Sequence, residues 1–203
     1  MILDELRSVL GNNATGDVVE FGCYRGDTSL LIEKVLEREF DNNRRLWIYD
    51  SFEGLPARTH EDASVAGDGF SEGELFVTKR EVVERFKRGG LLVPKIRKGF
   101  FENLEPGKIG ENGEVLKSSN DLPDKIIFAF LDGDLYQSIK TSLELVVPRL
   151  ARDEYGALCG TIIVHDYNNP QLPGVARAVD EWLATQKTAP RLQRRESLAI
   201  ISW

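Results

Sequence analysis

The sequence predicts an α/β fold in which a mostly parallel sheet carries helices on both faces. Short apolar runs rich in β-branched and aromatic residues alternate with segments of helical periodicity. Three of these runs end abruptly on polar residues, at Asp50, Asp132 and His165. The chain has 203 residues, and we expect residues 1–203 to form a single domain with one sizeable core.

Strands are predicted where short apolar runs are bounded by turn residues. The run 126–131 is apolar throughout, which is typical of a strand buried on both faces of a parallel sheet. The expected strands are 17–21, 46–50, 95–98, 126–131, 161–164 and 198–201, the last with 192–195 as an antiparallel edge partner.

Helices are predicted where apolar residues recur three and four positions apart. In segment 28–39, Leu31 and Val35 repeat at this spacing, as do Ile32 and Leu36, and we expect all four to form its buried face. The other expected helices cover about 79–87, a stretch with Ile139, Leu143 and Val146, and one with Val175, Val179 and Trp182.

Two polar segments, 56–76 and 106–124, interrupt the alternation and show no periodicity. Stretches of this length in a compact domain are usually functional lids or disordered loops. Both interpretations stay open, and the lid is favoured at 56–76 rather than at 106–124.

The composition excludes several classes of partner. A net charge of −7 disfavours binding to nucleic acid or to an anionic membrane. Lys187 and the arginines of 191–195 are therefore expected to form a solvated surface. Cys23 and Cys159 are too few for a disulfide framework, and no signal peptide or membrane span is visible. We expect a cytoplasmic protein with reduced cysteines.

A glycine-containing turn follows the first expected strand and reads Glu20-Phe21-Gly22-Cys23-Tyr24-Arg25-Gly26-Asp27-Thr28. Glycine at such a turn lets the backbone approach a ligand closely. The dinucleotide fingerprint G-x-G-x-x-G would need another glycine where Cys23-Tyr24 stands. The turn therefore suits a nucleoside without a pyrophosphate, with a plain tight turn as the alternative.

Acidic residues end the neighbouring expected strands. Asp50 can accept both hydroxyls of a ribose through its two carboxylate oxygens, although a solvated aspartate is the alternative. Asp132-Gly133-Asp134 follows the strand 126–131, and His165-Asp166 follows 161–164. Because open α/β folds bind ligands beyond the carboxyl ends of their strands, these residues predict the functional site.

Five blocks of residues, in order along the chain, resemble the macrocin O-methyltransferase family of class I S-adenosylmethionine (SAM) enzymes. The blocks are Val18 to Gly22 with Arg25-Gly26, Asp50-Ser51-Phe52-Glu53-Gly54-Leu55-Pro56, Lys98 to Leu104, Leu131 to Ser138, and His165-Asp166-Tyr167 with Pro173-Gly174-Val175. The second and fourth blocks are the most specific, and together the blocks span about residues 17–183.

The resemblance implies a Rossmann-like, seven-stranded class I methyltransferase fold whose last strand is antiparallel. It implies transfer of a methyl group from SAM to a hydroxyl of a small molecule, such as a sugar of a natural-product glycoside. The implied cofactor contacts are Glu20, Gly22, Tyr24, Gly26, Thr28, Asp50, Ser51 and Phe101. Glu20 would lie near the methionine part of SAM or brace the loop, and Phe101 would border the adenine or pack in the core.

The resemblance also implies a divalent metal, Mg²⁺ or Mn²⁺, at Asp132, His165 and Asp166. The family is expected to carry two acids where this chain has His165-Asp166. Since Mg²⁺ prefers oxygen ligands, weaker Mg²⁺ binding, a preference for Mn²⁺ and independence of metal all stay open.

Asp132 and His165 are the expected catalytic residues. An imidazole with an ordinary pKa near neutrality could act as the general base. Asp134 could take the proton instead, or could cap the following helix. Tyr136 and Tyr167 are expected either to line the acceptor site or to pack.

The resemblance further implies an N-terminal lid that is reduced here to residues 1–10. Enclosure of the substrate would then come from 56–76, from a partner subunit or from neither, and an exposed sheet edge allows a homodimer. Two other functions stay open. A protein that binds SAM without turnover, as a pseudoenzyme or as an assembly subunit in a biosynthetic pathway, is favoured by His165. A nicotinamide oxidoreductase is disfavoured by the missing middle glycine.

Overall fold

The computed structural model describes residues 1–11, 15–38, 44–67, 69–110, 115–186 and 189–203. The expected helix end at Glu39 and the basic residue Lys187 lie outside the described residues.

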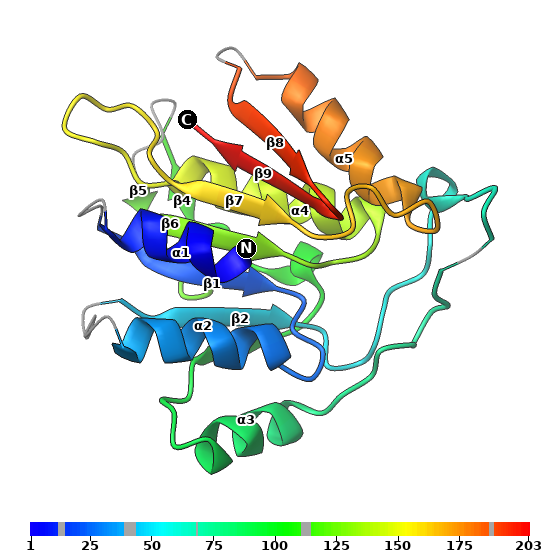
Figure 1. The fold of residues 1–203 in the computed structure, drawn as a ribbon, viewed down its shortest axis with the longest axis horizontal. Coiled ribbons are helices and arrows are strands. Elements are labelled where there is room, and N and C mark those ends of the chain that lie inside the picture. Colours follow the sequence, from blue (N-terminus) through cyan, green and yellow to red (C-terminus); the bar gives the residue numbers. More distant parts are fainter. Residues whose placement is uncertain (12–14, 39–43, 68, 111–114, 187–188) are drawn as a thin grey trace.

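A seven-stranded sheet forms the centre of the molecule (Figure 1), in the order β3-β2-β1-β6-β7-β9-β8. Its strands are β1 (Asp17–Phe21), β2 (Leu46–Asp50), β3 (Lys95–Lys98), β6 (Ile126–Leu131), β7 (Thr161–Val164), β8 (Arg191–Arg195) and β9 (Leu198–Ser202). β9 runs antiparallel to both of its neighbours, and the other pairings are parallel. The predicted sheet with an antiparallel last strand is confirmed.

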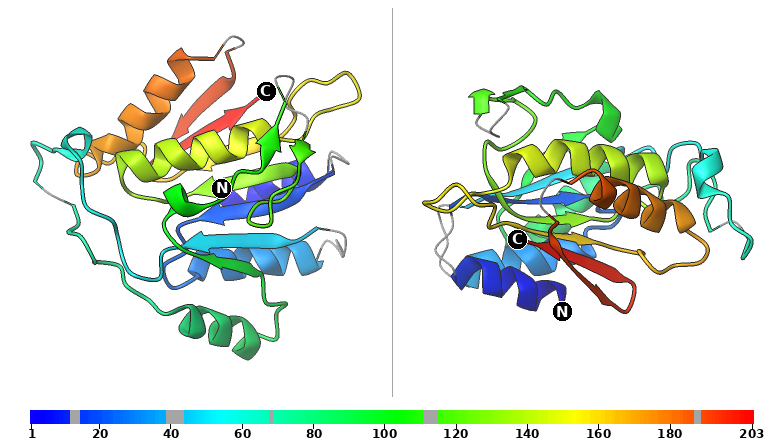
Figure 2. Two further views of the ribbon diagram at one scale, coloured as in Figure 1. Left: turned by 180° about the vertical axis from the view of Figure 1, so that it is seen from behind. Right: turned by 90° about the horizontal axis from the view of Figure 1, so that it is seen from above.

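Helices cover both faces of this sheet (Figure 2). The helices are α1 (Ile2–Gly11), α2 (Asp27–Arg38), α3 (Lys79–Arg88), α4 (Tyr136–Val146) and α5 (Pro173–Ala184). Apolar residues of α4 and α5 join one buried cluster, and those of α1, α2 and α3 join a second cluster across the sheet. The predicted helices are confirmed. Each helix buries one apolar stripe in the cluster on its own side of the sheet.

The prediction that Leu31 belongs to the buried face of α2 was wrong. Ile32, Val35 and Leu36 of α2 are buried, but Leu31 is 47% exposed. Because successive helical residues are rotated by about 100°, Leu31 points away from the stripe that contains Ile32. The stripe that packs on the sheet is therefore narrower than the sequence spacing suggested.

The first residues of the chain do not form a reduced lid, contrary to the expectation for residues 1–10. They form α1, whose Leu6 and Val9 are buried against α2 and the strands β6 and β7. This helix therefore contributes to the core.

Both polar segments contain short regular elements. Within 106–124, β4 (Lys108–Ile109) and β5 (Val115–Lys117) form an antiparallel pair, with residues 111–114 outside the described part. Within 56–76, a 3-10 turn, η1 (His60–Asp62), packs against α5. The expectation that these segments lack secondary structure was therefore wrong in both cases.

Among the described helices, none has the length and apolar character that crossing a bilayer requires. Cys23 and Cys159 are both free thiols, as predicted.

Candidate active site

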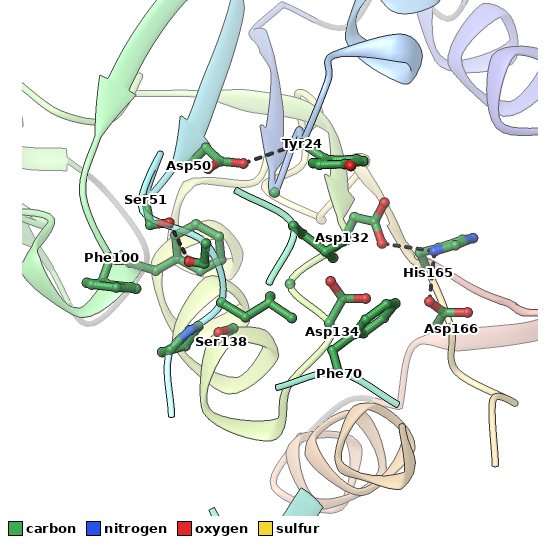
Figure 3. A pocket seen from close by; sticks show the side chains of 17 residues that line it. Tyr24, Asp50, Ser51, Phe70, Phe100, Asp132, Asp134, Ser138, His165 and Asp166 are labelled. Atoms are coloured by element: carbon green, nitrogen blue, oxygen red, sulfur yellow. Dashed lines mark hydrogen bonds and ion pairs between the residues drawn. The ribbon is translucent and has the colours of Figure 1, made fainter. Parts of the chain in front are cut away.

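The residues that the sequence places at strand ends lie together around one cavity of about 250 Å³ (Figure 3). Gly22, Asp132 and His165 directly follow β1, β6 and β7, respectively, and Asp50 is the last residue of β2; all four line the cavity. The cavity lies beyond the carboxyl ends of these strands, where the order of the sheet changes direction between β1 and β6. Open α/β sheets bind ligands at such switch points.

Gly22 brings the ends of β1 and β6 closer than any side chain would allow. Its φ is +85°, and a Cβ built on it would lie 2.0 Å from the carbonyl oxygen of Asp132. The backbone nitrogen of Asp132 donates to the carbonyl oxygen of Phe21 at 2.8 Å. The glycine turn and the acidic turn are therefore one unit at the floor of the site.

The carboxylate of Asp50 fixes the glycine turn. Its Oδ2 accepts hydrogen bonds from the backbone nitrogens of Cys23 (2.9 Å) and Tyr24 (3.1 Å), and its Oδ1 accepts one from Phe52 (2.8 Å). A carboxylate offers about four acceptor positions, so Asp50 can still accept from a ligand in the cavity that it lines. Its role as the ribose acceptor stays a prediction.

Glu20 braces the loop from below and does not line the cavity. Its side chain is 1% exposed and accepts a hydrogen bond from the Ser29 hydroxyl of α2. Burial raises the pKa of Glu20 to about 8. Of the two expected positions for Glu20, the structure supports the loop brace.

Two other expected cofactor contacts also lie outside the cavity lining formed by the described residues. Gly26 faces α3, where an added Cβ would lie 3.3 Å from Val82. Thr28 lies in the first turn of α2. Their positions indicate roles in packing the turn against the helices rather than in ligand contact.

An apolar wall completes the cofactor side of the cavity. Phe101 packs edge-on against Phe21, with ring centroids 5.1 Å apart, and also lines the cavity. Both expected roles of Phe101 are therefore compatible with its position. Ser51 donates to the carbonyl oxygen of Gly54 at 2.6 Å and so holds the turn after β2. Phe100 also lines the cavity, as do Pro56, Phe70 and Leu75 of the segment 56–76 that was expected to enclose the substrate. Sequence reasoning did not single out Leu55 and Ser138, which line it as well.

Asp132, His165 and Asp166 form a compact polar cluster (Figure 3). His165 Nδ1 lies 2.9 Å from Asp132 Oδ1 and 3.2 Å from Asp166 Oδ2. Hydrogen bonds to Asp132 and Asp166 raise the pKa of His165 to about 10. The imidazole is therefore protonated at neutral pH in this arrangement, which disfavours it as a general base.

The same three residues could hold a metal ion. One ligand atom from each lies within 4.8 Å of the others. A set of one imidazole nitrogen and two carboxylate oxygens suits Mn²⁺ better than Mg²⁺. Metal binding would require the neutral imidazole, so protons and metal would compete for His165.

Asp134 projects into the cavity and does not cap the following helix. It has a φ of +58°, and α4 begins two residues later at Tyr136. The backbone nitrogen of Tyr136 donates instead to Asp62 Oδ1 at 2.7 Å. Burial, followed by the charges of Asp132 and Asp166, raises the pKa of Asp134 to about 8. Of the two roles left open for Asp134, the cap is therefore wrong. Sequence reasoning missed Asp62, which lies 74 positions before Tyr136.

The two tyrosines near the site pack rather than line the cavity formed by the described residues. The Tyr136 hydroxyl donates to Glu181 at 2.6 Å. The Tyr167 hydroxyl donates to Asp180 at 2.6 Å and accepts from Arg194 at 2.9 Å. These bonds connect α4 to α5, and they connect the turn after β7 to α5 and β8.

The backbone around the cavity is unusually strained. Tyr24, Leu75, Asp134 and Asp166 line it and have φ values between +45° and +60°. Among the described non-glycine residues, only two others, Phe52 and Glu196, have positive φ. Such conformations cost about 1–3 kcal/mol each and gather at functional sites.

This sheet order, with an antiparallel last strand and an acidic cavity at its switch point, agrees with the class I SAM-dependent methyltransferase fold that the resemblance implies. The family model described as "Macrocin-O-methyltransferase (TylF)" matches residues 2–201, nearly the whole chain. The chain belongs to this family.

Characterised relatives and solved structures agree with this membership. The chain is 31% identical over 206 residues to the 8-demethyl-8-(2,3-dimethoxy-alpha-L-rhamnosyl)-tetracenomycin-C 4'-O-methyltransferase of Streptomyces olivaceus, covering 93% of this chain and 73% of that protein. It is 29% identical over 199 residues to the demethyldecarbamoylnovobiocin O-methyltransferase of Streptomyces niveus, covering 92% and 65%. The structure of the O-methyltransferase NovP superposes with a TM-score of 0.76 at 27% identity, covering 99% of this chain and 77% of that one.

Proposed function

We propose that this methyltransferase transfers a methyl group from SAM to a hydroxyl of a sugar unit in a natural-product glycoside. The acidic cavity is the observation that carries this proposal. It is lined by the carboxylates of Asp50, Asp132, Asp134 and Asp166, and none of its described lining residues is a lysine or arginine. SAM carries a positive sulfonium and a positive ammonium group, so a cavity with this charge favours it. Two relatives, whose names specify a rhamnosyl tetracenomycin and demethyldecarbamoylnovobiocin, support the acceptor class.

The cofactor would lie over the turn at Gly22, with its ribose on Asp50. Tyr24, Ser51 and Phe101 line the same side of the cavity and would contact the nucleoside. The carboxylate at the end of β2 supports a ribose at this place, and the missing middle glycine supports a nucleoside without a pyrophosphate.

The acceptor would lie on the opposite side, against Asp132, His165 and Asp166. A divalent ion held by these three residues would supply a Lewis acid that lowers the pKa of the acceptor hydroxyl. Without the ion, the protonated His165 provides a positive charge at the same place and can orient the acceptor oxygen by hydrogen bonding.

Asp134 is the best-placed group to receive the acceptor proton. It faces the cavity and is not engaged as a helix cap. Its pKa, raised to about 8, makes its ionised form a stronger base than an ordinary aspartate, and the ionised fraction grows as the pH rises towards 8. During transfer, the acceptor oxygen forms a bond to the methyl carbon while the carbon–sulfur bond breaks. The proton leaves to Asp134, and the products are the methyl ether and S-adenosylhomocysteine.

We further propose that residues 1–203 act as one methyltransferase domain and that segment 56–76 encloses the acceptor. Pro56, Phe70 and Leu75 of this segment line the cavity, which supports the second statement.

Calorimetry with S-adenosylhomocysteine and with NAD tests the cofactor. Binding of the first and not of the second is expected, and the reverse would overturn the proposal. Transfer of radiolabel from SAM to a panel of rhamnosylated and other glycosides tests the acceptor. Binding of S-adenosylhomocysteine without transfer to any hydroxylated acceptor, with Mn²⁺ or Mg²⁺ added or omitted, would favour a non-catalytic SAM-binding protein.

A further inference from the structure

A carboxylate in segment 56–76 is buried although aspartates are rarely buried without partners. The Asp62 side chain is 1% exposed. Its Oδ1 accepts from the backbone nitrogen of Tyr136 at 2.7 Å. Its Oδ2 accepts from the backbone nitrogen and the hydroxyl of Thr59, both at 3.0 Å. Three donors therefore compensate for the loss of water around this charge.

The bond to Tyr136 supplies a cap that α4 does not have locally. The N-cap residue is Leu135, whose side chain makes no capping hydrogen bond. A carboxylate at this end also interacts favourably with the helix dipole. Because α4 begins directly after Asp132-Gly133-Asp134, a fixed helix start also fixes the turn that carries the catalytic acids.

Gly174 leaves the space in which this carboxylate lies. A Cβ at Gly174 would lie 2.0 Å from Asp62 Oδ1 and 2.9 Å from the Cβ of Tyr136. Any larger residue at position 174 would therefore push Asp62 away from α4. This contact gives the Pro173-Gly174-Val175 block a structural role that the proposed chemistry does not use.

The same residue is connected to the wall of the cavity. Arg58 donates one hydrogen bond to the carbonyl oxygen of Asp62 and another, at 3.4 Å, to that of Phe70. Phe70 lines the cavity. A displacement of Asp62 would therefore reach both the acidic turn, through α4, and the acceptor wall, through Arg58.

We propose that Asp62 is a positioning residue for methyl transfer. It locks segment 56–76 onto the start of α4, and it thereby holds both Asp134 and Phe70 in place at the cavity. The role in catalysis rests on the proposed function, whereas the lock itself does not. Gly174 permits this arrangement, because a side chain at position 174 would occupy the space in which the Asp62 carboxylate lies.

The test compares Asp62→Ala and Asp62→Asn with Thr78→Ala. Thr78 caps α3 locally, through a hydrogen bond from the backbone nitrogen of Glu81, and like Asp62 it does not belong to the described lining of the cavity. Asp62→Ala should lower kcat by about 10–100-fold, because small displacements of reacting groups cost this much. The affinity for S-adenosylhomocysteine should change by less than about threefold, since the residues of the cofactor side are untouched. Thr78→Ala should leave kcat within about twofold.

Asp62→Asn should recover most of the lost kcat, because its carboxamide oxygen can still accept from Tyr136. A defect that Asp62→Asn shares in full, or that Thr78→Ala reproduces, would overturn the positioning role.

Amide hydrogen exchange tests the lock independently of turnover. In Asp62→Ala, and in Gly174→Ala through its clash with the carboxylate, peptides from 56–67 and 135–140 should exchange at least ~10-fold faster. In Thr78→Ala those peptides should be unchanged while those from 79–88 exchange faster. Unchanged exchange at 135–140 in both Asp62→Ala and Gly174→Ala would overturn the lock. Absence of methyl transfer by the unmodified protein would overturn the proposed function instead, and the exchange result would still decide the lock.

Discussion

The two ends of the central sheet each carry a cavity, and the larger one is not the proposed active site. The cavity at the carboxyl ends of the strands measures about 250 Å³, and the cavity at the amino ends of β1, β2, β3 and β6 about 590 Å³. The larger cavity combines Asp17 and Asp124 with Arg44, Lys95 and Lys125, so its charges are nearly balanced.

The polar groups of the larger cavity also have structural partners. Asp17 accepts from the backbone nitrogen of Arg45 at 2.9 Å and from the Trp47 indole at 2.7 Å. Lys95 lies over the Trp47 ring at 4.0 Å from its centroid. At the carboxyl end, by contrast, the described lining contains four carboxyl groups and a single histidine, which pairs with Asp132 and Asp166 only. Several of these lining residues also have strained backbones. Uncompensated charge and local strain therefore identify the functional end of this sheet, and cavity size does not.

The sharpest test of this contrast exchanges one aspartate at each end for asparagine. Asp132→Asn should lower kcat by about 10²–10⁴-fold, because it removes a charge that faces the acceptor. Asp17→Asn should leave kcat within about twofold and lower stability by about 1 kcal/mol through its bonds to Arg45 and Trp47. Radiolabel transfer and thermal unfolding measure the two effects. An equal loss of kcat in both variants would remove the distinction between the ends.

A second test concerns the close approach of backbone at the carboxyl end. Gly22→Ala should destabilise the fold by about 2–4 kcal/mol and weaken binding of S-adenosylhomocysteine, because its Cβ would meet the Asp132 carbonyl. Gly90→Ala is the matched control, since Gly90 has a φ of +66° but nothing within 4 Å of an added Cβ. It should cost only about 1 kcal/mol and leave binding unchanged. If urea unfolding gave equal losses of stability for the two variants, the predicted clash at position 22 would be contradicted.

A third test examines the metal preference of the acidic cluster. His165→Asp replaces an imidazole by an oxygen ligand and should raise Mg²⁺ affinity about 10-fold relative to Mn²⁺. His60→Asp is the control, because His60 is the other histidine and its side chain is 84% exposed. Calorimetric titration of both ions measures the ratio. No change of this ratio in His165→Asp would exclude His165 from the ligand set.

The smallest expected effect tests whether a shifted pKa marks function wherever it occurs. Glu33 on α2 lies outside both cavities that have been compared, and burial, with a contribution from Glu37, raises its pKa from 4.5 to about 7. A raised carboxyl pKa means that the folded state holds the proton more tightly than the unfolded state. Stability is therefore lost as pH rises from about 4.5 through about 7.

Glu33→Gln should remove this loss. The variant should be more stable than the unmodified protein by about 1–2 kcal/mol at pH 8, and the difference should vanish below pH 4.5. Unfolding measured across this range gives the difference curve, with kcat expected to be unchanged. A difference that grows towards acid pH would have the wrong sign.

Much of the fold was readable from local patterns. The strands of the sheet and the four helices predicted were confirmed, because each has a complete apolar run or stripe of its own. The misassignments occurred where packing against residues distant in the sequence decides whether a side chain is buried. Leu31 has the spacing of a core residue but lies beside the buried stripe, and α1 was mistaken for part of a lid because its partner surface is made by distant strands.

The candidate site divides in the same way. Gly22, Asp50, Asp132 and His165 stand at the carboxyl ends of strands, so the rule that parallel strands end at one edge was enough to bring them together. Packing decided the positions of Glu20 and Gly26, which face α2 and α3 rather than the cavity.

By itself, the sequence determined the parallel sheet, the glycine turn and the acids at the strand ends, since each depends on neighbours along the chain. Only the tertiary structure decided that Asp62 caps α4 and that Gly174 makes room for it. The physical reason is that the helix start needs a hydrogen-bond acceptor and leaves open which residue supplies it. Here the acceptor comes from 74 positions away, and no local pattern records that contact.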